Sequence, residues 1–265
     1  MFYLKKNKKR MLALCLSAAL SVGSLTVYAA TEQWNDASLT PAFTTKTAVS
    51  EHTDWADWKA NWDKIKTNYE QVALIPGSDF SKLNFGWYSK EKANEAVVRI
   101  ADNKDMKNAK EFKGTCTEGT VINGVQYYSN KVTADGFEPN TTYYYQVKLN
   151  GKWQQAHEYK TGDPHNFSFM YVGDPQIGAS KGQVPNESAV EQSEDVAARN
   201  DAYNWNKTLN SALAQHPEIN FLVSPGDQIN EPAGNNAEKH LLQEYEYSGY
   251  LSATAFRNLP QAVAI

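Results

Sequence analysis

Phe-Ser-Phe-Met-Tyr-Val-Gly-Asp-Pro-Gln-Ile-Gly, residues 167–178, is the stretch around which the second half of the chain is organised. Its first part, Phe167 to Val172, is nearly all aromatic or aliphatic, and Gly and Pro follow at once, which predicts a buried strand. Asp174 then lies where the carboxyl end of this strand opens into a loop. Open α/β sheets place their ligands at such loops, so Asp174 is a candidate functional residue.

A second stretch of the same kind follows further along the chain. Residues 221–230, Phe-Leu-Val-Ser-Pro-Gly-Asp-Gln-Ile-Asn, again form an apolar run, a Gly-Asp pair and a loop. Residues 200–216 between the two have helical spacing, with Trp205, Leu209, Ala212 and Leu213 on one face. The pattern predicts strand, helix, strand with a right-handed crossover, and places Asp174 and Asp227 at one rim.

Two carboxylates at one rim repel each other unless a cation lies between them. The pair Asp174 and Asp227 therefore points to a hard metal ion, for which carboxylate oxygens are preferred ligands. The alternative is that each Asp only caps the helix that follows it.

Residues 72–161 have the pattern of an all-β domain. Short apolar runs alternate with turn signals such as Asn123-Gly124, Asp135-Gly136 and Asn150-Gly151, which fits an immunoglobulin or fibronectin-III-like sandwich with Trp87 on its inner face. The expected strands are Val72–Ile75, Leu83–Tyr88, Ala96–Ala101, Val121–Val132, Thr142–Leu149 and His157–Lys160.

The amino terminus has the form of an export signal. A cationic segment ending at Arg10 precedes an apolar core from Met11 to Leu20, and small residues follow up to a cleavage position after Ala29 or Ala30. The formal net charge of −4 argues against nucleic-acid binding by bulk electrostatics. We therefore expect a secreted or extracytoplasmic protein with no membrane span once the signal is cleaved.

Residues 54–69 are predicted to form a helix with a tryptophan stripe. Trp55, Trp58 and Trp62 fall on one face together with Ile65 and Tyr69. The stripe either packs on the next domain or offers a carbohydrate-stacking surface. A second helix is expected over residues 236–256, with Leu241, Leu242, Tyr245 and Phe256 facing inward.

Three of these segments resemble the calcineurin-like metallophosphoesterases of the purple acid phosphatase type. Gly-Asp-Pro-Gln (173–176) and Gly-Asp-Gln-Ile-Asn (226–230) are similar to the first two motif blocks, and residues 139–145 are similar to the Pro-x-Thr-x-Tyr-x-Tyr strand of the preceding domain. The resemblance implies a multidomain β plus α/β protein. Its expected parts are a signal peptide (1–29), a leader with the Trp-rich helix (30–70), a fibronectin-III-like sandwich (71–163) and an incomplete phosphoesterase α/β domain (164–265).

The resemblance also implies a dinuclear site with two ions of iron, zinc or manganese. Asp174 would bind one metal and Asp227 would bridge the pair, while Gln176 and Asn230 stand where relatives carry His or Tyr and are further candidate ligands or hydrogen-bonding neighbours. None of the five histidines fits the later motif blocks, so the catalytic His is expected beyond Ile265.

The function implied is hydrolysis of a small phosphate ester, most simply a monoester, by an exported enzyme. We expect the chain to be an N-terminal fragment that is inactive alone. Two alternatives remain: a phosphodiesterase or nucleotidase of the same fold, and a secreted non-enzymatic binding protein that uses the sandwich and the Trp-rich helix. The sequence gives no oligomeric state and no role for the polar segment from Ala179 to Asp195.

Overall fold

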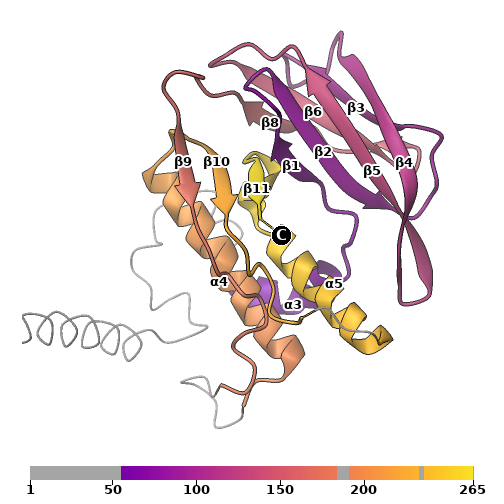
Figure 1. Ribbon diagram of the computed structural model, residues 1–265, viewed down its shortest axis with the longest axis vertical. Helices are drawn as coiled ribbons and strands as arrows, with labels where there is room; N and C mark the ends of the chain where they lie inside the picture. The colour runs from indigo at the N-terminus through magenta and orange to yellow at the C-terminus, as the bar shows by residue number, and fades with distance from the viewer. Residues whose placement is uncertain (1–54, 184–190, 233–235, 265) are drawn as a thin grey trace, which may run out of the picture.

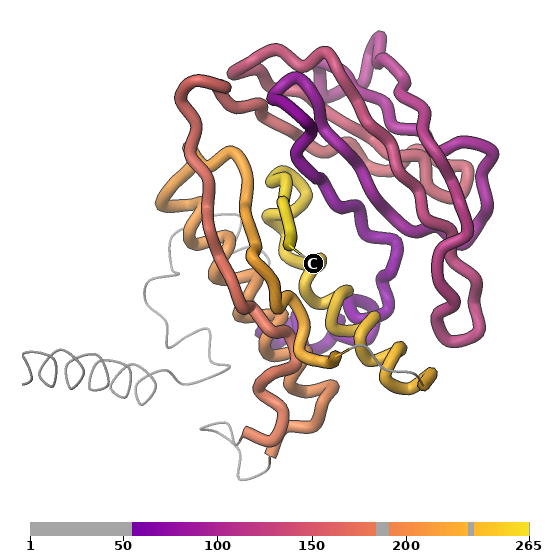
Figure 2. Tube along the Cα trace, viewed as in Figure 1, coloured from indigo at the N-terminus to yellow at the C-terminus, as the bar shows by residue number. Residues whose placement is uncertain are grey.

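The computed structural model describes residues 55–183, 191–232 and 236–264, which form an antiparallel β unit and a smaller α/β unit (Figure 1). The predicted signal peptide, residues 30–54 of the predicted leader and residues 184–190 of the polar segment after Ala179 lie outside these residues. Figure 2 shows how the chain returns on itself, since β1 (Ala73–Pro76) and β11 (Gln261–Val263), far apart in sequence, lie in contact.

The antiparallel unit is one sheet folded over on itself, because its longest strand changes partner. β4 (Lys110–Ile122) pairs with β3 (Ala96–Ala101) up to Gly114, and with β5 (Val125–Asp135) from Thr115 onward. The two layers enclose an apolar core in which Phe85 and Tyr145 meet with ring centroids 5.2 Å apart. The strand order is β1-β2-β5-β4-β3-β6-β7 with β8 on β6, where β2 is Lys82–Ser89, β6 Thr142–Leu149, β7 Lys152–Trp153 and β8 His157–Lys160.

The predicted sandwich is confirmed in outline, and Trp87 lies in its core as expected. The predicted single strand Val121–Val132 is wrong. A hairpin stands there, because Asn123 and Gly124 adopt φ angles of 48° and 77° and reverse the chain between β4 and β5. Most of β4 was not predicted from the sequence, because its residues are mainly polar on both faces of the strand. They give no alternating apolar pattern.

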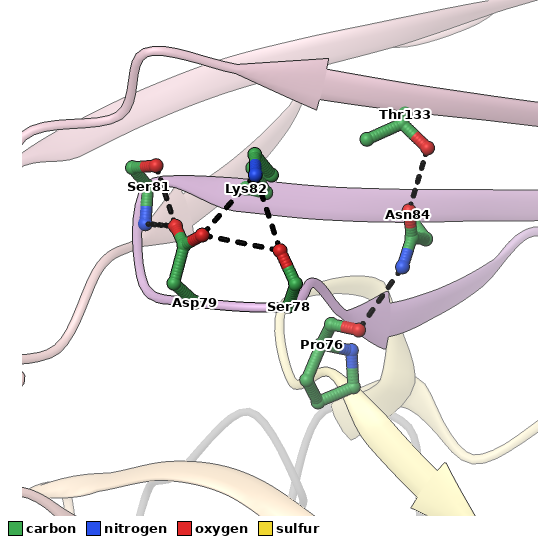
Figure 3. Close-up of polar contacts among 7 residues, drawn as sticks. All are labelled: Pro76, Ser78, Asp79, Ser81, Lys82, Asn84 and Thr133. Atoms are coloured by element: carbon green, nitrogen blue, oxygen red, sulfur yellow. Dashed lines mark hydrogen bonds and ion pairs between the residues drawn. The ribbon is translucent and has the colours of Figure 1, made fainter.

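The connection from β1 to β2 is held by a polar cluster around Asp79 (Figure 3). Asp79 Oδ1 accepts hydrogen bonds from the Ser81 amide (3.0 Å) and hydroxyl (2.5 Å), and Lys82 Nζ lies 3.2 Å from Oδ2. The hydrogen bonds from Ser81, together with Lys82, lower the pKa of Asp79 to about 2. The cluster fixes the start of β2, and Asn84 then joins Pro76 of β1 to Thr133 of β5.

The α/β unit is built on a parallel sheet in the order β11-β10-β9, with β9 at Ser168–Tyr171 and β10 at Ile219–Ser224. The predicted strand, helix, strand arrangement is therefore confirmed. The connecting helix α4 (Glu194–Gln215) starts earlier than the predicted residue 200, because the Ser193 side chain caps it by accepting a hydrogen bond from the Val196 amide. The predicted loop from Ala179 is correspondingly shorter.

Helix α3 (Trp55–Lys66) packs on this α/β unit. Trp58 and Trp62 are buried, and their indole N–H groups donate to Arg199 O (3.0 Å) and Asp195 Oδ1 (2.9 Å) of α4. The packing role of the tryptophan stripe is confirmed, but its partner is the α/β unit and not the sandwich that follows it in sequence, and these two rings are not available to stack on a carbohydrate.

Helix α5 (Ala237–Leu251) is shorter than predicted and is followed by a 3-10 turn, η3 (Thr254–Arg257). Phe256 is buried as expected, but Leu241, Leu242 and Tyr245 are only half-buried. The buried residues of α5 are Glu246, Ser248, Gly249 and Tyr250, so the burial is concentrated in the C-terminal half of the helix.

Candidate functional site

The loops that follow β9 and β10 run side by side, joined by main-chain hydrogen bonds. The amide of Asp174 donates to Gly226 O (3.5 Å), and that of Gln176 donates to Asp227 O (2.9 Å). The Asn230 amide then donates to Ile177 O (3.0 Å), where Ile177 and Ile229 form a parallel bridge. The structure therefore brings the backbones of the predicted ligands together at one end of the sheet, a surface that we call the rim.

Asp174, Asp227 and Asn230 are exposed at the rim, and Gln176 is half-buried. The backbone there is unusual, since Asp174, Gln176 and Asp227 all have left-handed φ angles, 63°, 35° and 49°. Residues other than glycine rarely adopt this conformation, and it persists only where the surroundings hold it in place. Such clusters of strained residues are commonest at functional sites.

Two acidic residues below the rim were not predicted from the sequence. Asp201 of α4 accepts hydrogen bonds through Oδ2 from the amides of Gly178 (3.0 Å) and Ser180 (3.1 Å). Glu246 of α5 accepts through Oε2 from the amides of Asn230 (3.1 Å) and Glu231 (2.7 Å). The sequence contains one indication that Glu246 is buried. It lies one helical turn from both Leu242 and Tyr250, and so shares their face of the helix.

Burial dominates the electrostatics of both groups. It raises the pKa of Glu246 to about 7, although its two amide donors act in the opposite direction. Burial likewise raises the pKa of Asp201. Both carboxyl groups thus lie in a desolvated layer between the rim loops and the helices.

The donor atoms at the rim suit a hard cation but form a partial ligand set. Asp174 and Asp227 offer carboxylate oxygens, and Gln176 and Asn230 offer neutral amide oxygens, which bind such ions more weakly. Within residues 55–183, 191–232 and 236–264, no group of three or more His, Cys, Asp or Glu side chains is arranged to hold a metal ion.

Three of the described histidines lie away from the rim, and His52 lies outside the described residues. His240 Nε2 lies 2.9 Å from Thr120 Oγ1, and His216 Nδ1 lies 3.2 Å from a Glu218 oxygen. Burial and the Arg257 guanidinium lower the pKa of His157. In the part of the chain that the structure describes, no helix is both long and apolar enough to cross a membrane.

Comparison with known proteins gives a match for the antiparallel unit. Residues 69–161 match the family model described as the purple acid phosphatase N-terminal domain. No curated protein matches the sequence.

Two solved structures are similar to larger parts of the chain at low identity. One is the purple acid phosphatase PPD1 from yellow lupin (Lupinus luteus) seeds, with 14% identity and a TM-score of 0.45 over 74% of this chain and 34% of that one. The other is PhoD, with 15% identity and a TM-score of 0.44 over 75% of this chain and 39% of that one. The chain thus spans little more than a third of the length of either protein.

Proposed function

We propose that this chain, whose residues 69–161 match the purple acid phosphatase N-terminal domain, is part of an exported metal-dependent phosphoesterase that hydrolyses phosphate monoesters. The observation that carries the proposal is the rim. A phosphatase-type sandwich is followed directly by two parallel strands whose paired loops carry Asp174 and Asp227 at the same end of the sheet.

The chemistry of ester hydrolysis explains why these residue types would be needed. A phosphate ester carries negative charge on its phosphoryl oxygens, and a bound metal pair neutralises this charge and acidifies water. Asp174 and Asp227 would hold the ions through their carboxylate oxygens. Gln176 and Asn230 would orient neighbouring groups or add a neutral ligand, which leaves iron, zinc and manganese as candidates.

Two other functions remain as alternatives. A phosphodiesterase or nucleotidase would use the same rim with a different substrate pocket. The non-enzymatic binding protein is weakened by the burial of Trp58 and Trp62, since the tryptophan stripe is committed to packing on α4. The proposal also includes the exported state, the domain boundaries and a small phosphate ester as the partner.

The proposal is tested by comparing the full-length wild-type protein with Asp227→Asn. The substitution keeps the size of the side chain but removes the charge, so we expect bound metal and hydrolysis of an aryl phosphate both to fall at least about ten-fold. Elemental analysis and steady-state kinetics measure the two quantities.

The control is Asp135→Asn, which removes an exposed carboxylate that pairs with Lys110 at 3.4 Å on the sandwich. Metal content and activity should then equal those of the wild type. A folded wild-type protein that binds no metal and hydrolyses no phosphate ester would refute the enzyme.

A further inference from the structure

We infer that Asp201 and Glu246 are positioning residues, which hold the two rim loops in the strained conformation that presents Asp174 and Asp227. The inference rests on the proposed function, because it takes these two aspartates to be the metal ligands. It adds two residues from helices that carry no recognisable motif.

The hydrogen bonds divide between the two loops. Asp201 takes two amides from the segment that follows Asp174, and Glu246 takes two from the segment that follows Asp227. Each loop is therefore tied at two consecutive or nearly consecutive amides to a different helix, α4 or α5. Each side chain accepts both of its bonds through one oxygen, so a single buried group restrains two amides of its loop.

Gly178 is the point at which the two carboxyl groups come together. Its amide is bound by Asp201, and a Cβ added to it would lie 2.1 Å from Glu246 Oε1. Its φ angle of 106° is also one that residues with side chains rarely adopt. The glycine that ends the stretch at 167–178 is thus needed because Glu246 occupies the space beside it.

The strain at the rim explains why such fixing is needed. Left-handed φ angles at Asp174, Gln176 and Asp227 are unfavourable on their own, so the loops would relax if the flanking backbone were free. Asp174 and Asp227 are themselves exposed and cannot be fixed by packing. The hydrogen bonds from four loop amides to Asp201 and Glu246 therefore restrain the loops on the side that faces α4 and α5.

Hydrogen exchange of the full chain tests this role directly, and NMR reads it at single amides. Glu246→Leu removes the acceptor while filling the space, so the amide of Glu231 should exchange about ten-fold faster, whereas the Asn230 amide keeps its bond to Ile177 O. Asp201→Leu should do the same for Gly178 and Ser180. Glu246→Gln and Asp201→Asn each keep an oxygen acceptor and should restore most of the protection.

Metal titration supplies the second readout, with Mn²⁺ as the probe. We expect Glu246→Leu to weaken Mn²⁺ binding about ten-fold and Glu246→Gln to stay close to the wild type, as for other residues that orient ligands. The matched control is Glu244→Leu, two residues away on α5, whose side chain is 14% exposed and lies 3.9 Å from His240. It should change neither the four amides nor Mn²⁺ affinity.

Two results would overturn the inference: amides that stay protected in both Leu variants, or Mn²⁺ affinity that is unchanged although those amides have become exposed. A wild-type protein that binds no Mn²⁺ while the Leu variants lose protection counts against the proposed function instead. The exchange data and the titration therefore separate the two failures.

Discussion

At Gly114 the backbone of β4 passes so close to β5 that a side chain has no room. An added Cβ would lie 1.9 Å from the Lys131 carbonyl oxygen, and this is the residue after which β4 changes partner. We expect Gly114→Ala to lower the free energy of unfolding by about 3 kcal/mol, which is the upper end of the cost of overpacking. The cost is high because the main chain of β5 cannot move aside as a side chain can. Urea denaturation measures the loss.

Gly124 provides the matched control, because it lies in the β4–β5 turn with a φ angle of 77°, and a Cβ added to it would meet no atom within 4 Å. Gly124→Ala should cost only the strain of a left-handed alanine, about 1 kcal/mol. Equal losses in the two variants would show that the close approach at Gly114 does not limit the fold.

The individual residues at the rim show how much of the candidate site the sequence could predict. Asp174 and Asp227 were predictable because each follows an apolar strand, and strand ends of a parallel sheet share one edge. Asp201 and Glu246 were not, because a carboxylate on a helix is usually solvated and its partners here are amides contributed by loops distant in sequence. Only the tertiary fold supplies those partners.

At the scale of the element, α3 depends on its tryptophans for attachment to the α/β unit. Trp62 is 4% exposed and Trp55 is only half-buried, with its ring 4.9 Å from that of Tyr203. We expect Trp62→Ala to cost about 3–5 kcal/mol, as for a large buried aromatic, and to release α3 for limited proteolysis near Lys59 and Lys64.

Trp55→Ala is the comparison, since it truncates the same residue type at a less buried position. It should cost clearly less than Trp62→Ala and leave α3 resistant to protease. If both variants are cleaved at the same rate, α3 is not held mainly by its buried tryptophan face.

Elements with a strong periodic pattern were predicted closely, and those without one were not. The bounds of β3, β6 and β8 agree with the prediction because apolar residues alternate or turns flank them closely. The start of α4 was missed because Glu194 and Asp195 read as loop, although acidic residues favour the first turn of a helix.

At the scale of the whole molecule, the antiparallel unit and the α/β unit are joined by specific polar contacts. Gln71 Nε2 donates to Ser248 O of α5 (2.9 Å), and Thr120 Oγ1 of β4 lies 2.9 Å from His240 Nε2 of α5. The sequence could predict that two units follow each other, because the all-β pattern of residues 72–161 is followed by a strand, helix, strand pattern from residue 167. It could not predict how they dock, since the contacts join residues far apart in the chain.

Tyr145 tests whether this docking contributes to stability. Its side chain is 2% exposed, and its hydroxyl donates to Arg257 O of η3 at 2.8 Å. Tyr145→Phe keeps the ring in the core of the sandwich but leaves a carbonyl of the other unit without this donor, so we expect a loss of about 1–1.5 kcal/mol. Chemical denaturation measures it.

The adjacent Tyr144 separates docking from any general effect of losing a hydroxyl on β6. Its hydroxyl lies 3.3 Å from Glu158 Oε2 within the sandwich, so Tyr144→Phe should change the free energy of unfolding by less than about 0.5 kcal/mol. A loss at Tyr144 as large as that at Tyr145 would mean that the hydroxyls act within the sandwich alone. The larger loss at Tyr145 would instead show that the two units stabilise each other, because only that hydroxyl reaches across to η3.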